Sequence, residues 1–212
     1  MTPPEFGQQF REELHALFRW RRDVRRFRPD PLPPGALERL VEVAALSPSV
    51  GLSEPWRFVS VEDAATRRAV REIFLRCNEE ARAAQSPERR DRYAALKLAG
   101  LDLAPCQLAL FVQGDPAQGH GLGRRTMPDT VAYSAVTALH TIWLAARAEG
   151  IGLGWVSILQ PDEVAAALSV PPDWRLIAYC CLGYPERWED VPELEREGWS
   201  ARNGAAIRLH RR

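Results

Sequence analysis

The chain has no net charge, no metal-ligand motif and no long apolar run. Its 28 basic and 28 acidic side chains cancel, so no global field favours nucleic acid or an anionic membrane. No apolar run approaches the roughly 20 residues of a membrane span, and the first residues lack the basic start and apolar core of a signal peptide. These absences predict a cytoplasmic protein that binds neither nucleic acid nor membrane.

Cysteine and histidine are scarce as well. The four cysteines form no CxxC pair and the four histidines are scattered, so no metal site is predicted. Cys180 and Cys181 stand in an apolar run, where free cysteine behaves as a small hydrophobe. No GxSxG elbow is present, and a hydrolase is therefore not indicated.

The hydrophobic pattern predicts one α+β domain over residues 1–212, with an irregular tail over 200–212 and no regular structure after Trp188. Helices are expected over residues 6–20, 33–46, 63–83, 88–103, 129–149 and 161–168. Strands are expected over residues 56–61, 107–113, 150–157 and 176–182. The helix over 129–149 is apolar almost all round, which predicts full burial in a core or against a partner subunit.

The run from Arg21 to Phe27 is the most informative stretch, because four guanidinium groups flank one carboxylate. Guanidinium groups bind phosphate bidentately, so Arg21, Arg22 and Arg25 indicate a phosphate-bearing ligand. Asp23 would repel phosphate and is expected to face the chemistry instead. A solvated charged turn is the alternative interpretation.

Three alternating glycines, Gly150, Gly152 and Gly154, precede Ser157. A dinucleotide fingerprint follows a strand and opens a helix, whereas these glycines follow a helix and open a strand, so a Rossmann site is rejected. They are expected to leave one strand face bare, against which a flat ring can lie. A helix C-cap would explain Gly150 alone.

Six segments resemble the flavin-destructase branch of the nitroreductase superfamily, the 5,6-dimethylbenzimidazole synthase (BluB) family. They are RRDVRRF (21–27), SPSVGLSEPWRFV (47–59), YAALKLAGLDLAP (93–105), GRRTMPDTVAYS (123–134), WLAARAEGIGLGWVSI (143–158) and LGYPERWEDVPELEREGW (182–199). The resemblance is collinear over nearly the whole chain. It implies a nitroreductase-like FMN-binding fold, with a mainly antiparallel central sheet surrounded by helices and a long helix at a dimer interface.

The resemblance also implies an oxidoreductase whose substrate is reduced FMN. Fragmentation with dioxygen would give 5,6-dimethylbenzimidazole, the lower ligand of cobalamin, and erythrose 4-phosphate. FMN would lie at the interface of a homodimer, and a flavin reductase would transiently supply its reduced form.

Site residues follow from the same resemblance, position by position. Asp23 falls at the acid–base position and Ser157 at the serine beside the flavin ring, which makes these two the expected catalytic residues. Residues 77–100 match a helical lid. The residues expected to contact the flavin are Arg21, Arg22, Asp23, Val24, Arg25, Pro48, Ser49, Val50, Lys97, Gly154, Trp155, Val156, Ser157 and Arg202.

The chain departs from the family pattern at Glu54, where the family has Gln, and at Val131, where it has Asp. Both positions are expected near the pocket. An NAD(P)H-dependent flavin oxidoreductase that recycles FMN therefore stays open as an alternative. A flavin-binding protein without turnover is the third possibility.

Overall fold

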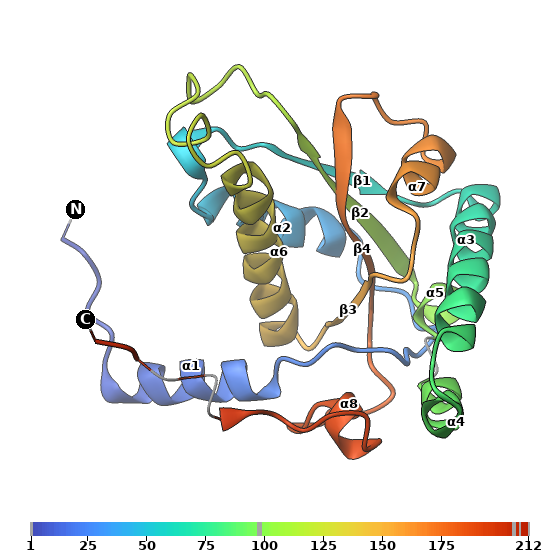
Figure 1. The fold of residues 1–212 in the computed structure, drawn as a ribbon. Helices are drawn as coiled ribbons and strands as arrows, with labels where there is room; N and C mark the ends of the chain where they lie inside the picture. Colours follow the sequence, from blue (N-terminus) through green and yellow to red (C-terminus); the bar gives the residue numbers. More distant parts are fainter. Residues whose placement is uncertain (1, 97–98, 205–206, 208, 212) are drawn as a thin grey trace.

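A four-stranded antiparallel sheet forms the centre of the computed structural model, which describes residues 2–96, 99–204, 207 and 209–211 (Figure 1). The strand order is β1-β2-β4-β3. The strands are β1 (Trp56–Ser60), β2 (Cys106–Gln113), β3 (Gly152–Val156) and β4 (Trp174–Gly183). All four strands predicted from the sequence are therefore confirmed, as is the α+β class.

Helices cover both faces of this sheet (Figure 1). They are α1 (Gln8–Trp20), α2 (Ala36–Glu42), α3 (Ala64–Ala83), α4 (Pro87–Ala95), α5 (Gly100–Leu103), α6 (Thr130–Ala148), α7 (Pro161–Ala167) and α8 (Glu193–Arg196). Short 3-10 turns occupy Val43–Leu46 and Val50–Leu52. In the described part of the chain, no helix is long and apolar enough to cross a membrane.

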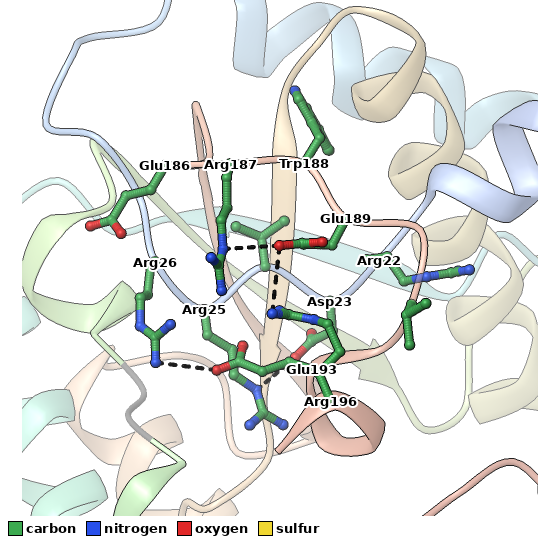
Figure 2. Close-up of a pocket in the computed structure, with 12 residues that line it drawn as sticks. Arg22, Asp23, Arg25, Arg26, Glu186, Arg187, Trp188, Glu189, Glu193 and Arg196 are labelled. Carbon is green, nitrogen blue, oxygen red and sulfur yellow. Dashed lines mark hydrogen bonds and ion pairs between the residues drawn. The ribbon is translucent and has the colours of Figure 1, made fainter. Parts of the chain in front are cut away.

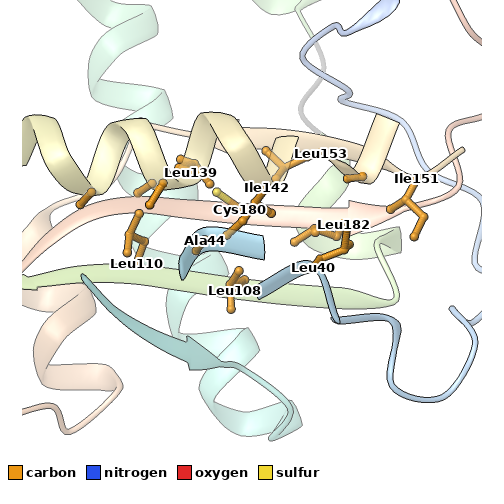
Figure 3. Packing of buried hydrophobic residues seen from close by; sticks show 14 of the residues in the cluster. Leu40, Ala44, Leu108, Leu110, Leu139, Ile142, Ile151, Leu153, Cys180 and Leu182 are labelled. Carbon is orange, nitrogen blue, oxygen red and sulfur yellow. The ribbon is translucent and has the colours of Figure 1, made fainter. Parts of the chain in front are cut away.

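Alternation along β2 divides the core into two clusters, because successive strand residues point to opposite faces. Leu108 and Leu110 pack with α2 and α6, in the cluster shown in Figure 3. Ala109 and Phe111 pack on the other face, with residues of α3, α5 and α7. Burial of both faces explains why this strand is apolar throughout rather than alternating.

Helix α6 lies where the sequence predicted it, but only one side of it is buried. The buried residues are Val131, Ser134, Ala135, Ala138, Leu139, Ile142 and Ala146. Tyr133 and Val136 point outward and are 57% and 39% exposed. The predicted burial all round the helix is thus not met within a single chain.

Two local predictions were wrong. The helix expected over 88–103 is split, because Leu96 leaves the helical conformation with ψ of 74° and ends α4. The next helix begins at Gly100, where a Cβ would come within 3.1 Å of the Phe27 ring. The sequence predicted irregular chain where the structure has helix α8. This helix was missed because its four residues provide too little periodicity to detect.

Candidate functional site

Residues 21–28 form the first part of the connection between α1 and α2 and pass alongside the edge strand β3. The Val24 amide donates a hydrogen bond of 3.1 Å to the Leu153 carbonyl. Farther along, Phe27 forms an antiparallel bridge with Pro185, just beyond β4. Main-chain pairing at two points therefore fixes the arginine-rich segment against the sheet.

The glycines of β3 make this close approach possible. A Cβ on Gly154 would lie 2.0 Å from the Val24 carbonyl oxygen, and one on Gly152 would lie 2.8 Å from Val24 Cγ2. The bare strand face is thus filled by the protein's own segment. This corrects the expectation that a flavin ring fills it, while contact between the Gly154 backbone and flavin stays a prediction.

Asp23 is held from two directions. Its Oδ1 accepts a hydrogen bond of 2.8 Å from the Trp155 amide, and its Oδ2 accepts one of 3.4 Å from Arg25 Nε. Burial raises the pKa of the Asp23 carboxyl above its ordinary value, outweighing the lowering by Trp155 and Arg25, and Glu193 raises it further. Asp23 is therefore a stronger base than a surface aspartate.

The guanidinium groups of Arg21 and Arg22 are stabilised through space by one carboxylate each, since Asp23 raises the pKa of Arg21 and Asp190 raises that of Arg22. Arg21 stacks over the Trp143 ring at 4.7 Å, and Arg22 donates to the Asp190 carbonyl at 3.0 and 2.5 Å. Burial lowers the pKa of Arg21 and of Arg22, and repulsion from Arg202 lowers both further.

Within the described residues, no carboxylate forms an ion pair with Arg21, Arg22 or Arg202. Three mutually repelling guanidinium groups are a suitable donor set for an anion such as phosphate. Arg25 differs, because its guanidinium is engaged with Asp23.

A cavity separates this segment from the chain that follows β4 (Figure 2). Residues 22–26 form one wall, and members of 186–196, including α8, form the other. A smaller cavity lies on the inner side of Asp23 and is lined by Gly154, Trp155 and Val156. Asp23 therefore borders both cavities, and the structure brings Val24, Arg25 and the end of β3 together around it.

The loop of Pro48, Ser49 and Val50 lies elsewhere on the same chain. Ser49 Oγ accepts from the Glu54 amide, and the Val50 amide donates to Ser134 Oγ on α6. On that helix Ser134 is about 13 Å from Trp143, the residue beneath Arg21, at roughly 1.5 Å per residue. Within one subunit, the two groups of predicted flavin-contacting residues are therefore attached at different places along α6.

The remaining predicted residues are less closely involved. Ser157 is the first residue after β3 and is exposed, as is Arg202. Lys97 lies outside the described residues. In the predicted lid, Tyr93 of α4 donates to Asn78 Oδ1 at 3.0 Å and its ring meets Trp199 edge-on. The lid function stays a prediction.

The two departures from the family pattern lie in different environments. Glu54 adopts a left-handed conformation with φ of 41° and accepts a hydrogen bond from Gln118. Val131 is 4% exposed in the core cluster on α6. Its apolar side chain therefore packs in the core, while its expected proximity to the pocket stays a prediction.

The wall formed by residues 186–196 was missed by sequence reasoning. Its charged side chains pair across and within the cavity: Glu189 with Arg187 and Arg196, and Glu193 with Arg26 (Figure 2). The available signal was the dense alternation of acidic and basic residues after Tyr184. That pattern is also typical of a solvated loop.

Comparison with known proteins places the chain in the nitroreductase family. The sequence model described as "Nitroreductase family" matches residues 18–184. The 5,6-dimethylbenzimidazole synthase of Rhodospirillum rubrum is 55% identical to this chain over 201 residues, which cover 95% of each protein. The enzyme of the same name from Rhodobacter capsulatus is 48% identical, over 92% of this chain and 94% of its own.

Among solved structures, oxidized iodotyrosine deiodinase bound to FMN and 3-iodo-L-tyrosine has a TM-score of 0.74 and 22% identity. The match covers 93% of this chain and 99% of the deiodinase. At this level of identity the likeness concerns the fold.

Proposed function

Because the chain belongs to the nitroreductase family, we propose that it binds FMN and acts as a 5,6-dimethylbenzimidazole synthase. It would fragment reduced FMN with dioxygen to 5,6-dimethylbenzimidazole and erythrose 4-phosphate. The observation that carries the proposal is the placement of Asp23, a strengthened base in an arginine-rich segment, in a chain 55% identical to a synthase of that name.

The residues present fit the phosphate of FMN. Arg21, Arg22 and Arg202 would hold it, since a dianion relieves their mutual repulsion and matches the guanidinium fork. Residues 154–156 would border the flavin through the backbone of β3. Ser157 would donate its hydroxyl at the ring edge, where the family places a serine.

Asp23 would accept the proton released when a carbon bond of the ribityl chain breaks. Reduced FMN would supply the carbon atoms of the product and the electrons, dioxygen would accept those electrons, and the pyrimidine part of the flavin would leave as a separate fragment. A carboxylate with a raised pKa accepts a proton more readily than an ordinary aspartate does. The Trp155 amide fixes Oδ1, which orients the carboxylate toward the cavities on either side. Residues 77–100 would exclude water.

The functional unit would be a homodimer with FMN at the subunit interface. Two observations support this: α6 leaves Tyr133 and Val136 exposed, and the 48–50 loop is remote from the arginines of its own chain. Across a dimer, the loop of one subunit would complete the site of the other. A separate flavin reductase would deliver reduced FMN, and the setting would be the cytoplasm.

The test is incubation of the pure protein with reduced FMN and air, followed by chromatography and mass spectrometry of the products. We expect 5,6-dimethylbenzimidazole and loss of FMN. Catalytic reduction of quinones or nitro compounds by NAD(P)H, with FMN intact, would instead identify a recycling oxidoreductase. Tight binding with neither reaction would identify a flavin-binding protein.

A further inference from the structure

Glu193 is a second carboxylate in the cavity bordered by Asp23. It opens α8 and faces the arginine-rich segment from the opposite wall (Figure 2). Its Oε1 lies 3.4 Å from Arg26 Nη2, and its side chain is 11% exposed. Nothing in the proposed function so far uses this residue.

The surroundings of Glu193 are costly for stability. Its Oε1 is buried and accepts no hydrogen bond from the described residues. The ion pair with Arg26 is therefore the polar contact that this atom makes among them. A buried carboxylate with incomplete hydrogen bonding contributes little to folding and often destabilises the protein. A role in the chemistry of the cavity explains its position better than a role in folding.

The charge around Asp23 comes from several elements. Arg25 and Arg21 belong to its own segment, Cys180 and Cys181 lie on β4, and Glu193 lies on α8. Burial raises the pKa of both thiols, to about 12 for Cys181, so they stay neutral. The cavity itself is also lined by Arg22, Arg26, Glu186, Arg187, Glu189 and Arg196. Among its glutamates, Glu193 is the one whose charge raises the pKa of the Asp23 carboxyl.

We propose that Glu193 is a positioning residue of the reaction, which rests on the proposed function. Its carboxylate, seated on Arg26, offsets the positive charge of the arginine-rich wall and keeps Asp23 effective as a base. The arginines can then bind a phosphate without weakening the proton acceptor that stands among them.

The experiment measures the titration of the Asp23 carboxyl directly, by carbon-13 NMR of the protein without FMN. In Glu193→Gln we expect the midpoint to fall by about 0.5–1 pH unit, the effect of one charge several ångströms away. With reduced FMN, the acid limb of the kcat–pH profile should shift to lower pH by the same amount. The plateau kcat should fall about two- to threefold, because proton transfer follows base strength.

Three variants separate this role from simple anchoring of α8. Glu193→Asp keeps the charge and should restore the wild-type midpoint. Glu189→Gln removes one charge from the same wall, where Glu189 pairs with Arg187 and Arg196. It should leave the midpoint within about 0.2 units, because Glu193 and not Glu189 acts on the pKa of Asp23. Arg26→Gln breaks the same ion pair and should not lower the midpoint.

An unchanged Asp23 midpoint in Glu193→Gln would overturn the inference. So would equal downward shifts in Glu193→Gln and Arg26→Gln, because these would report loss of the anchor alone. The proposed function fails separately, if the wild-type protein forms no benzimidazole while the NMR shift is as expected.

Discussion

Asp23 combines an oriented carboxylate with a raised proton affinity. Asp23→Asn keeps the size of the side chain and an oxygen for the Trp155 amide but removes the base. We expect benzimidazole formation to fall at least about a thousandfold, within the range attributed to general-base catalysis. The FMN dissociation constant should change less than about threefold. Equal losses of binding and turnover would show that Asp23 merely organises the arginines.

The same substitution should alter stability in a pH-dependent way. Because folding raises the pKa of Asp23 above its ordinary 3.8, the folded state retains more protons above that pH, and wild-type stability falls as pH rises through the folded pKa. Asn cannot titrate. Asp23→Asn should therefore melt higher than wild type at pH 7, with the difference vanishing below about pH 3.8, as calorimetry can measure. A lower melting temperature at pH 7 would mean that the contacts of Asp23 with Arg25 and Trp155 outweigh its desolvation.

Arg21 and Arg25 should differ in what they contribute. Arg21 has no carboxylate partner among the described residues, so Arg21→Ala should weaken FMN binding by about 2 kcal/mol, or roughly 30-fold. Arg25→Ala should chiefly reduce turnover, because Arg25 contacts Asp23. Arg28→Ala is the matched control, since Arg28 pairs with Asp30 on the surface. Fluorescence titration measures the FMN affinity of all three variants, and product formation measures their turnover. A larger affinity loss for Arg25→Ala than for Arg21→Ala would contradict this assignment.

Strand β3 allows a graded test of its glycines. Gly154→Ala should displace the Asp23 segment and abolish FMN binding, because the new Cβ meets the Val24 carbonyl. Gly152→Ala should be milder, since it meets only the Val24 side chain. Gly150→Ala has free space but a φ of 74°, so it should cost stability of about 1 kcal/mol and leave binding intact. Urea unfolding and FMN titration report the two effects, and equal binding losses at all three positions would refute the order.

The elements that the sequence predicted correctly are those with long apolar patterns. Strands β2 and β4 and helix α6 each extend over enough residues for their burial to be visible in composition. The break between α4 and α5 and the single turn of α8 depend on contacts with distant residues. Local patterns do not contain that information.

In the whole molecule, the exposed face of α6 predicts a dimer. Sedimentation velocity at micromolar concentration should show a species of twice the chain mass. Val136→Glu should produce monomers that lose FMN, because a charge is placed in the interface. Leu75→Glu, at an exposed leucine of α3, should remain dimeric. A monodisperse wild-type monomer would contradict the proposed interface.

The site was predictable only in part, because its residues are far apart in the sequence. The arginine-rich segment and the end of β3 were found because their residue types are distinctive. Their proximity follows from main-chain pairing between Val24 and Leu153, which no spacing in the sequence reveals. Glu193 was missed because its environment exists only once the chain after β4 has folded back over residue 23.

The position of residues 186–196 after the last strand has a consequence for folding. All four strands are complete at Gly183, whereas the second wall of the cavity begins at residue 186. The sheet can therefore be completed by residues that all precede the second wall of this cavity. Contacts between residues 22–26 and 186–196 close a loop of almost the entire chain, and such contacts form late. The second wall of the cavity would thus be among the last contacts to form on folding, and a chain that has assembled only its sheet would still lack it.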